Sequence, residues 1–301
     1  MRVVAFTEFG ASPAIHEIDV PAPGAGEVRV RVHAASINGF DLAVANGYVQ
    51  GMMEHRFPVV LGKDFAGVVD AVGEGADGYA VGDRVFGTVT KPYLGDGSLG
   101  EYVTVPVAIG VAKLPEAVSF TDGGALGLAG SAAVDAVTAA APQPGERVLV
   151  SGATGGVGNL VVQLATRAGA TVIATAHTDE EKALVTSLGA AETADHTTDL
   201  AAQVKDVDVV FHLAGDPAAL LGVLRSGGRF VSTLVGSPDQ LPTEEHTVLP
   251  VFAQPTEDKL NRLASGETRV VVEKVYPFEE ATAAIAHFVA GTKGKIVVSL
   301  I

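Results

Sequence analysis

The sequence contains no cysteine and no tryptophan. Without cysteine the chain can form no disulfide, no zinc–thiolate site and no thiol nucleophile. This composition is typical of a cytoplasmic protein, and we expect that compartment. Basic residues are also scarce, because 20 Lys and Arg stand against 35 Asp and Glu, a formal net charge of −15. That charge repels nucleic acid and anionic membranes, so we expect neither as a partner.

Long apolar runs and clustered metal ligands are missing as well. No apolar stretch is long and uninterrupted enough to predict a membrane span, and the first residues lead directly into a strand-like segment without a signal-peptide core. The eight histidines show no ligand-like spacing, so we predict no metal site. With 301 residues, 48% of them hydrophobic, and 36 glycines, the chain is predicted to form two turn-rich globular domains.

One stretch that is present organises the rest: an apolar run at residues 148–150 breaks into glycines and resumes after Asn159. This pattern predicts a strand, a tight turn and a helix. Glycine lacks the Cβ that would keep a pyrophosphate from the backbone, and the helix N-terminus offers free N–H donors. A glycine turn without a ligand is the alternative. We predict a dinucleotide site formed by Gly152, Ala153, Thr154, Gly155, Gly156, Val157 and Gly158.

A second strand, residues 170–175, ends where such a fold contacts the adenosine ribose. An acidic residue there would bind the 2′-hydroxyl of NAD, but the strand ends in Thr175, Ala176, His177 and Thr178. Two hydroxyls, an imidazole and the nearby Lys182 suit a 2′-phosphate better, which predicts NADPH. A solvated helix start with a Thr or Asp cap is the alternative interpretation.

The remaining pattern predicts an α/β protein. Residues 1 to about 115 are β-rich, and residues 27–34 alternate apolar and polar side chains with period two. Helical sequence begins near Ser119 and includes residues 129–141. Strands at 207–213 and 228–234 then alternate with helices, which indicates a parallel sheet. A helix after Pro255, a strand at 270–276, a helix at 279–290 and a strand at 296–300 complete the chain.

Residues 35–41, 57–69, 82–87 and 294–298, together with the glycine turn, resemble one family. In order and spacing the chain is similar to the zinc-independent, zeta-crystallin-like quinone oxidoreductases of the medium-chain dehydrogenase/reductase superfamily. The resemblance implies a GroES-like β-barrel substrate domain at residues 1–120, completed by 256–301. It also implies a Rossmann domain with a doubly wound parallel sheet at 121–255. Family dimers pair through the last Rossmann strand, here 248–252, so we expect a homodimer.

Departures from the related zinc alcohol dehydrogenases bear on the chemistry. Residues 38–41 replace a catalytic cysteine, and Gly62, Lys63 and Asp64 replace a Gly-His-Glu motif. A protonated lysine cannot ligate zinc, so the resemblance implies metal-free catalysis. It also implies that Ser131, Leu213 and Ala214 lie at the cofactor and His196 near the phosphate. Glu181 stands where related reductases carry a phosphate-binding lysine, which leaves Lys182 rotated by about 100° on the helix.

These implications predict hydride transfer from NADPH to a quinone or an α,β-unsaturated carbonyl. Asn38 and Tyr48 match family positions near the nicotinamide and are the predicted catalytic residues. In the alternative interpretation both residues are structural: Asn38 is a turn residue and Tyr48 anchors a loop. We expect Asp41 to hold the loop by hydrogen bonding rather than to act as a base.

Three other functions share part of this pattern. In a short-chain dehydrogenase the glycine turn opens the chain and a Tyr-x-x-x-Lys pair follows, but here about 150 residues precede the turn and no tyrosine has a lysine four residues later. An enoyl-thioester reductase of the same fold is one alternative. An NADPH-binding protein with a regulatory or structural role and little turnover is another, and steady-state turnover would separate it from an enzyme.

Overall fold

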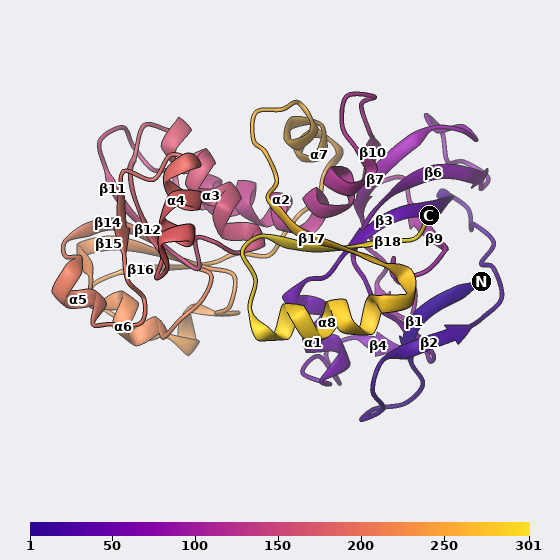
Figure 1. Ribbon diagram of the computed structural model, residues 1–301, viewed down its shortest axis with the longest axis horizontal. Helices are drawn as coiled ribbons and strands as arrows, with labels where there is room; N and C mark the ends of the chain where they lie inside the picture. Colours follow the sequence, from indigo (N-terminus) through magenta and orange to yellow (C-terminus); the bar gives the residue numbers. More distant parts are fainter. The chain divides into compact units, whose positions relative to one another are not determined.

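A computed structural model describes all 301 residues, and the chain divides into two compact units. The first unit comprises residues 1–128, 255–267 and 272–301, and the second comprises 129–254 and 268–271. Both combine strands with helices, which confirms the predicted α/β class. Figure 1 shows the chain coloured along the sequence.

A six-stranded parallel sheet forms the centre of the second unit. Its strands, in spatial order, are β13 (Glu192–Ala194), β12 (Thr171–Thr175), β11 (Arg147–Ser151), β14 (Val207–His212), β15 (Leu224–Ser232) and β16 (Thr247–Pro250). Numbered along the sequence, these six strands have the order 3-2-1-4-5-6 of a dinucleotide-binding sheet. The predicted doubly wound Rossmann sheet is therefore confirmed.

Helices lie in the connections between these strands. They are α3 (Gly156–Arg167), α4 (Asp179–Ser187), α5 (Leu200–Gln203) and α6 (Pro217–Leu221), with a 3₁₀ turn η1 (Pro238–Gln240). Helix α3 buries Leu160, Val161 and Leu164 and contacts β11 and β12. Fully buried Leu149 and Phe230 of the sheet belong to the core of this unit. Burial of these apolar side chains is the main source of its stability.

The first unit is built on antiparallel strands. Its largest sheet has the order β10 (Val111–Lys113), β7 (Arg84–Thr88), β6 (Asp64–Val72), β3 (Glu27–Ser36), β18 (Lys295–Ser299) and β17 (Val272–Pro277), with β9 (Tyr102–Pro106) also paired to β3. Smaller sheets join β2 (Ala14–Glu17), β1 (Arg2–Phe6) and β5 (Val59–Val60), and β4 (Glu54–His55) with β8 (Tyr93–Leu94). Its helices are α1 (Gly39–Ala45), α7 (Glu257–Ala264) and α8 (Ala281–Ala290), the last preceded by a 3₁₀ turn η2 (Phe278–Glu280).

Strand β3 is central to that sheet. Val28, Val30 and Val32 are buried, whereas the alternate side chains are half-buried or exposed, which confirms the predicted period of two. The last strand of the chain, β18, pairs antiparallel with the end of β3 and parallel with β17. In Figure 1 the yellow end of the chain therefore runs beside an indigo strand.

Helix α2 (Phe120–Ala140) begins where helical sequence was predicted to start, near Ser119. Its early glycines resemble helix breakers in the sequence, but they allow close packing. A Cβ on Gly124 would lie 2.7 Å from the Ala34 carbonyl oxygen, and one on Gly127 would collide with the Gly87 carbonyl. Contrary to prediction, α2 is long and apolar enough to cross a bilayer, although 72% of its apolar window is buried inside the protein.

Candidate functional site

The glycine turn has the predicted strand–turn–helix geometry. Strand β11 ends at Ser151, Gly152 has a φ of +78°, and α3 starts at Gly156 after Gly155 as N-cap. A Cβ on Gly158 would collide with the Gly152 carbonyl and lie 2.7 Å from the Ala153 Cα. Only glycine at 158 therefore lets the helix start so close to the strand.

The start of α3 is open to an anion. No side chain caps the helix, so the N–H groups of its first turn, at Gly156 and Val157, are not satisfied by a cap. Gly155, Gly156, Val157 and Thr154 are half-buried, whereas Ala153 and Gly158 are buried. This arrangement could hold the pyrophosphate of a dinucleotide, because the half-buried residues keep surface open to solvent while the buried ones pack the turn.

The loop after β14 lies against the same turn. Ser151 Oγ donates a hydrogen bond of 2.7 Å to the Ala214 carbonyl, and a Cβ on Gly152 would approach the Ala214 Cβ to 3.0 Å. The structure therefore brings Leu213 and Ala214 together with the glycine turn. The turn and this loop follow the neighbouring parallel strands β11 and β14, at the switch point where open α/β sheets bind ligands.

A buried histidine that the sequence analysis missed holds this loop. His212 Nε2 lies 3.1 Å from the Gly215 carbonyl, and Nδ1 lies 2.9 Å from Ser232 Oγ. Because a carbonyl only accepts, Nε2 carries the proton and the Ser232 hydroxyl donates to Nδ1. Burial lowers the pKa of His212 and favours this neutral ring. The available signal was that His212 and Ser232 end adjacent strands in register.

Thr175, at the end of β12, stabilises the turn from the other side. Its buried hydroxyl accepts a 3.0 Å hydrogen bond from Gly152 N and donates to the Val150 carbonyl at 3.3 Å. Both hydrogen bonds connect Thr175 to the backbone of β11 and of the glycine turn. Thr175 therefore shapes the glycine turn, and its hydroxyl has no proton left to donate to a 2′-phosphate.

Thr178 and Glu181 form a capping box at the start of α4. Thr178 Oγ1 accepts from Glu181 N at 3.2 Å, and Glu181 Oε2 accepts from His177 N and Thr178 N at 2.7 and 3.2 Å. Lys182 forms an exposed 3.8 Å ion pair with Asp179 of the same helix. The capping alternative thus describes Thr178, while Lys182 keeps an exposed ammonium group.

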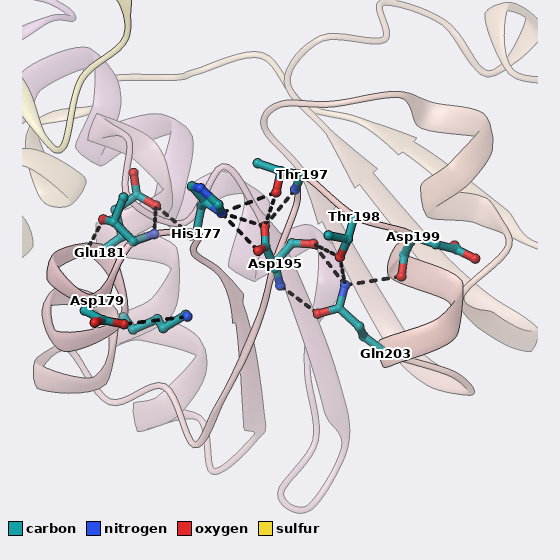
Figure 2. A network of polar contacts seen from close by, with 10 residues as sticks. His177, Asp179, Glu181, Asp195, Thr197, Thr198, Asp199 and Gln203 are labelled. Atoms are coloured by element: carbon teal, nitrogen blue, oxygen red, sulfur yellow. Dashed lines mark hydrogen bonds and ion pairs between the residues drawn. The ribbon is translucent and has the colours of Figure 1, made fainter.

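Asp195 meets His177 beyond this cap (Figure 2). Its carboxylate lies 3.0 Å from His177 Nδ1 and accepts from Thr197 N at 2.9 Å and Thr197 Oγ1 at 2.7 Å. These hydrogen bonds hold the pKa of Asp195 well below its usual range. The His196 ring is nearly perpendicular to that of His177, with centroids 6.2 Å apart. Asp195 was not predicted, because it follows β13, one strand beyond the expected position.

In the first unit Asn38 belongs to a buried polar network. Its Nδ2 donates to Asp64 Oδ2 at 3.0 Å, and its Oδ1 accepts from Lys295 Nζ at 2.5 Å. Lys295 also lies 3.2 Å from Asp64, and the side chains of both are at least 98% buried. The Asn38 amide is therefore engaged at both ends by charged groups.

Two further residues stabilise the loop around α1. Asp41 accepts from Asn38 N at 2.8 Å and from Gly62 N at 3.1 Å, which confirms that it holds the loop. Burial raises the pKa of Asp41 to about 6. Lys63 Nζ donates to the Val89 carbonyl at 3.0 Å, and burial lowers the pKa of this lysine.

Tyr48 and Ser131 are placed very differently. Tyr48 follows α1, is 76% exposed, and its hydroxyl has no hydrogen-bond partner in the chain. Beside this turn lies a cavity of about 320 Å³, with no charged residue in its wall, lined by Phe9, Gly10, Ala11, Ser12, Pro13, Ala45, Asn46, Gly47 and Gln50. Ser131 is buried in the second unit, and its hydroxyl also lacks a partner. No three His, Asp or Glu side chains gather as a metal site.

Comparisons with known proteins agree with this architecture. Residues 24–116 match the alcohol dehydrogenase GroES-like domain family, and residues 156–264 match the zinc-binding dehydrogenase family. Quinone oxidoreductase of Lama guanicoe is 30% identical over all of this chain and 98% of its own length. The GroES-like domain and the Rossmann domain that the resemblance implied are thus both confirmed.

Solved structures give the same result. The quinone oxidoreductase from Coxiella burnetii has a TM-score of 0.88 at 25% identity, covering 100% of this chain and 99% of that one. An NAD-dependent alcohol dehydrogenase also scores 0.88, at 28% identity and full coverage of both chains. CurK enoyl reductase scores 0.84 at 27% identity, covering 100% of this chain and 99% of its own. The dehydrogenase fold implies a nicotinamide cofactor, and the quinone oxidoreductase relatives imply a small-molecule substrate. The chain belongs to the quinone oxidoreductase branch of the medium-chain dehydrogenase/reductase superfamily.

Proposed function

We propose that the protein is a zinc-independent oxidoreductase that transfers hydride from NADPH to a quinone or an α,β-unsaturated carbonyl. The observation that best supports the cofactor site is the uncapped start of α3, reached through a turn that only glycine permits and contacted by the Ala214 loop. The bound nicotinamide would supply the hydride. The chain itself would bind the cofactor, orient the acceptor beside it and stabilise the charge that develops on the acceptor oxygen.

The residues of the second unit then have distinct tasks. The first-turn N–H groups of α3 hold the pyrophosphate, and the loop at Leu213 and Ala214, fixed by Ser151 and His212, borders the cofactor. His177, His196 and Lys182 lie at the end where a 2′-phosphate would bind, and their side chains can donate to it when protonated. A preference for NADPH depends on these three groups.

Metal-free catalysis is supported by what Lys63 and Asp64 contact. The Lys63 ammonium donates to the Val89 carbonyl, and Asp64 is paired with Lys295. These contacts engage the side chains that stand where the related zinc alcohol dehydrogenases carry the His and Glu of their motif. An acceptor that is already electron-poor, such as a quinone, needs alignment and one hydrogen-bond donor rather than a Lewis acid.

For the acceptor we propose Tyr48 as the donor toward the oxygen that gains charge, because its hydroxyl is exposed and unpartnered. The cavity beside it has only uncharged residues in its wall, which suits a neutral ring better than an anionic substrate. Asn38, held between Lys295 and Asp64, is a fixed polar group of the same loop.

We also propose a homodimer formed through β16. This strand is at the edge of the parallel sheet, with unpaired backbone groups on its outer side, and Phe252 just beyond it is 66% exposed. A molar mass measured by light scattering that corresponds to two chains, and to one chain in Phe252→Asp, would support it.

The function is tested by following NADPH oxidation with a panel of quinones, enones, enoyl thioesters and aldehydes, with and without a chelator. Turnover of quinones or enones that survives the chelator is expected. Preference for an enoyl thioester would favour the activity in the name of CurK enoyl reductase. NADPH binding without turnover of any acceptor would point to a regulatory or structural protein.

A further inference from the structure

His177 is fixed at three points at the end of β12. Its backbone N–H donates to Glu181, and its ring Nδ1 contacts both oxygens of Asp195 at 3.1 and 3.0 Å (Figure 2). Thr197 approaches the same ring nitrogen at 3.3 Å. The side chain is 51% exposed, and Nε2 makes no hydrogen bond in the chain, so this nitrogen is free to meet a ligand.

The partner of Nδ1 determines what Nε2 can do. An ionised carboxylate only accepts hydrogen bonds, so Nδ1 must carry a proton. When the ring is neutral, Nε2 is therefore an acceptor, and when the ring is protonated, Nε2 is a charged donor. The ribose 2′-hydroxyl of NADH can donate to an acceptor, whereas the 2′-phosphate of NADPH requires a donor.

Asp195 itself is not free to bind the ribose. Thr197 N, Thr197 Oγ1 and His177 Nδ1 already surround its carboxylate. Glu181 is likewise occupied by the N–H groups of His177 and Thr178. The two acids nearest the strand end are thus engaged by the chain, and the histidine ring is what they leave facing outward.

We propose that Asp195 fixes the proton on Nδ1 of His177 and so makes His177 the residue that discriminates between the cofactors. The neutral ring accepts from the 2′-hydroxyl of NADH, and the protonated ring donates to the 2′-phosphate of NADPH. Preference for NADPH then rises as pH falls. This inference rests on the proposed nicotinamide-dependent function and specifies the regulation of its ribose end.

Other charged groups surround His177 and contribute to the electrostatic potential at its ring. Helix α4 provides Asp179, Glu180, Glu181 and Lys182, and the segment after β13 provides Asp195, His196 and Asp199. Asp179 and Lys182 pair with each other, which leaves their joint field nearly neutral. His196 is the second histidine at this end, with its ring centroid 6.2 Å from that of His177, so the test must separate the two rings.

The test measures binding rather than activity. Calorimetry on the full chain gives the dissociation constants of NADPH and NADH at pH 6.5, 7.5 and 8.5. The ratio of the NADH constant to the NADPH constant should rise about tenfold from pH 8.5 to 6.5, the effect of one charge-assisted hydrogen bond. His177→Gln cannot titrate and should change by less than about threefold, which also measures the contribution of the 2′-phosphate's own protonation.

Asp195→Asn tests the proton placement. Its amide can donate to Nδ1, which lets the neutral ring carry its proton on Nε2, so the pH dependence should shrink to nearly that of His177→Gln. Asp199→Asn is the matched control, because Asp199 caps α5 through Ala201 N and does not contact His177. That variant should keep the wild-type dependence.

The outcomes separate the two proposals. A wild-type protein that binds neither cofactor would overturn the proposed function and the inference together. Binding of both cofactors with a ratio independent of pH would overturn the inference alone. So would full pH dependence in Asp195→Asn, or full dependence in His177→Gln, which would assign the response to His196.

Discussion

Lys295 Nζ lies 3.2 Å from Asp64 Oδ2, at a place where neither side chain reaches solvent. Lys295 opens β18 and Asp64 opens β6, and both strands pair with β3. Asp64 also accepts from Ser36 Oγ, Asn38 Nδ2 and the backbone N–H of Leu128. The pair therefore joins the last strand of the chain to the loop that carries the candidate catalytic residues.

Lys295→Met should destabilise the protein by about 3–5 kcal/mol, because it leaves a buried carboxylate without its cation. Urea unfolding followed by circular dichroism measures the loss. The double variant Lys295→Met, Asp64→Asn removes both charges and should recover part of the stability. Equal stability of wild type and Lys295→Met would show that the charge of Asp64 is compensated by its hydrogen bonds alone.

Two glycines of the turn should respond differently to alanine. A Cβ on Gly155 meets only the Gly152 carbonyl at 3.4 Å, and its φ of −72° is allowed for alanine. Gly155→Ala should leave the melting temperature nearly unchanged but weaken NADPH binding about tenfold or more, because the methyl group would face the pyrophosphate. Calorimetric titration tests this, and unchanged affinity would place the pyrophosphate elsewhere.

Gly158→Ala should lower stability as well as affinity. Its Cβ would collide with the Gly152 carbonyl, so the start of α3 must move away from β11. Overpacking of this kind costs about 1–3 kcal/mol. Thermal unfolding of Gly158→Ala beside Gly155→Ala separates packing from ligand contact, and identical melting temperatures would contradict the assignment.

Asp41 should make stability fall as pH rises. Its pKa is raised from 3.8 to about 6 in the folded protein, so between these values the folded state binds more protons than the unfolded state. The unfolding free energy should therefore decrease between about pH 4 and 6, by about 3 kcal/mol from this group. The difference between wild type and Asp41→Asn, measured across that range, isolates the effect. A difference that does not vary with pH would contradict the raised pKa.

Tyr48→Phe should reduce kcat/KM for a quinone about five- to two-hundredfold, the loss of one hydrogen-bond donor in the transition state. Because Tyr48 is exposed, stability and NADPH affinity should stay unchanged. Stopped-flow and steady-state kinetics with a quinone measure it. Wild-type efficiency would remove Tyr48 from the site, and complete inactivity of the folded variant would make it an obligatory proton donor.

The elements found from the sequence were those with a local signal. The alternation in β3 and the glycines after β11 each show their environment within a few residues, because burial on one face and a positive φ restrict residue type directly. The same local reasoning placed the start of helical sequence near Ser119, and α2 begins at Phe120. Its glycines serve close contact with distant strands rather than chain reversal, and only the tertiary structure distinguishes these uses.

The polar contacts of the candidate site were harder to predict from the sequence. Asn38 meets Lys295 across 257 positions, and His177 meets Asp195 across 18, so no motif spacing linked them. Thr175 and Thr178 were proposed as hydroxyls that bind a phosphate. In the structure Thr175 hydrogen-bonds the glycine turn and Thr178 caps α4. Which hydroxyl remains free depends on hydrogen bonds that residue type alone does not determine.

The pairing of β18 with β3 has a consequence for biosynthesis. Asp64 leaves the ribosome 231 residues before Lys295, which at 5–20 residues per second is a delay of about 10–50 s. Throughout that time the nascent first unit has neither the strand that borders β3 nor the cation that neutralises Asp64. The second unit, whose sheet ends at Pro250, is translated and free to fold before the first can close. Late in synthesis, chaperones that act on the nascent chain should therefore bind the open edge of β3 rather than an incomplete Rossmann sheet.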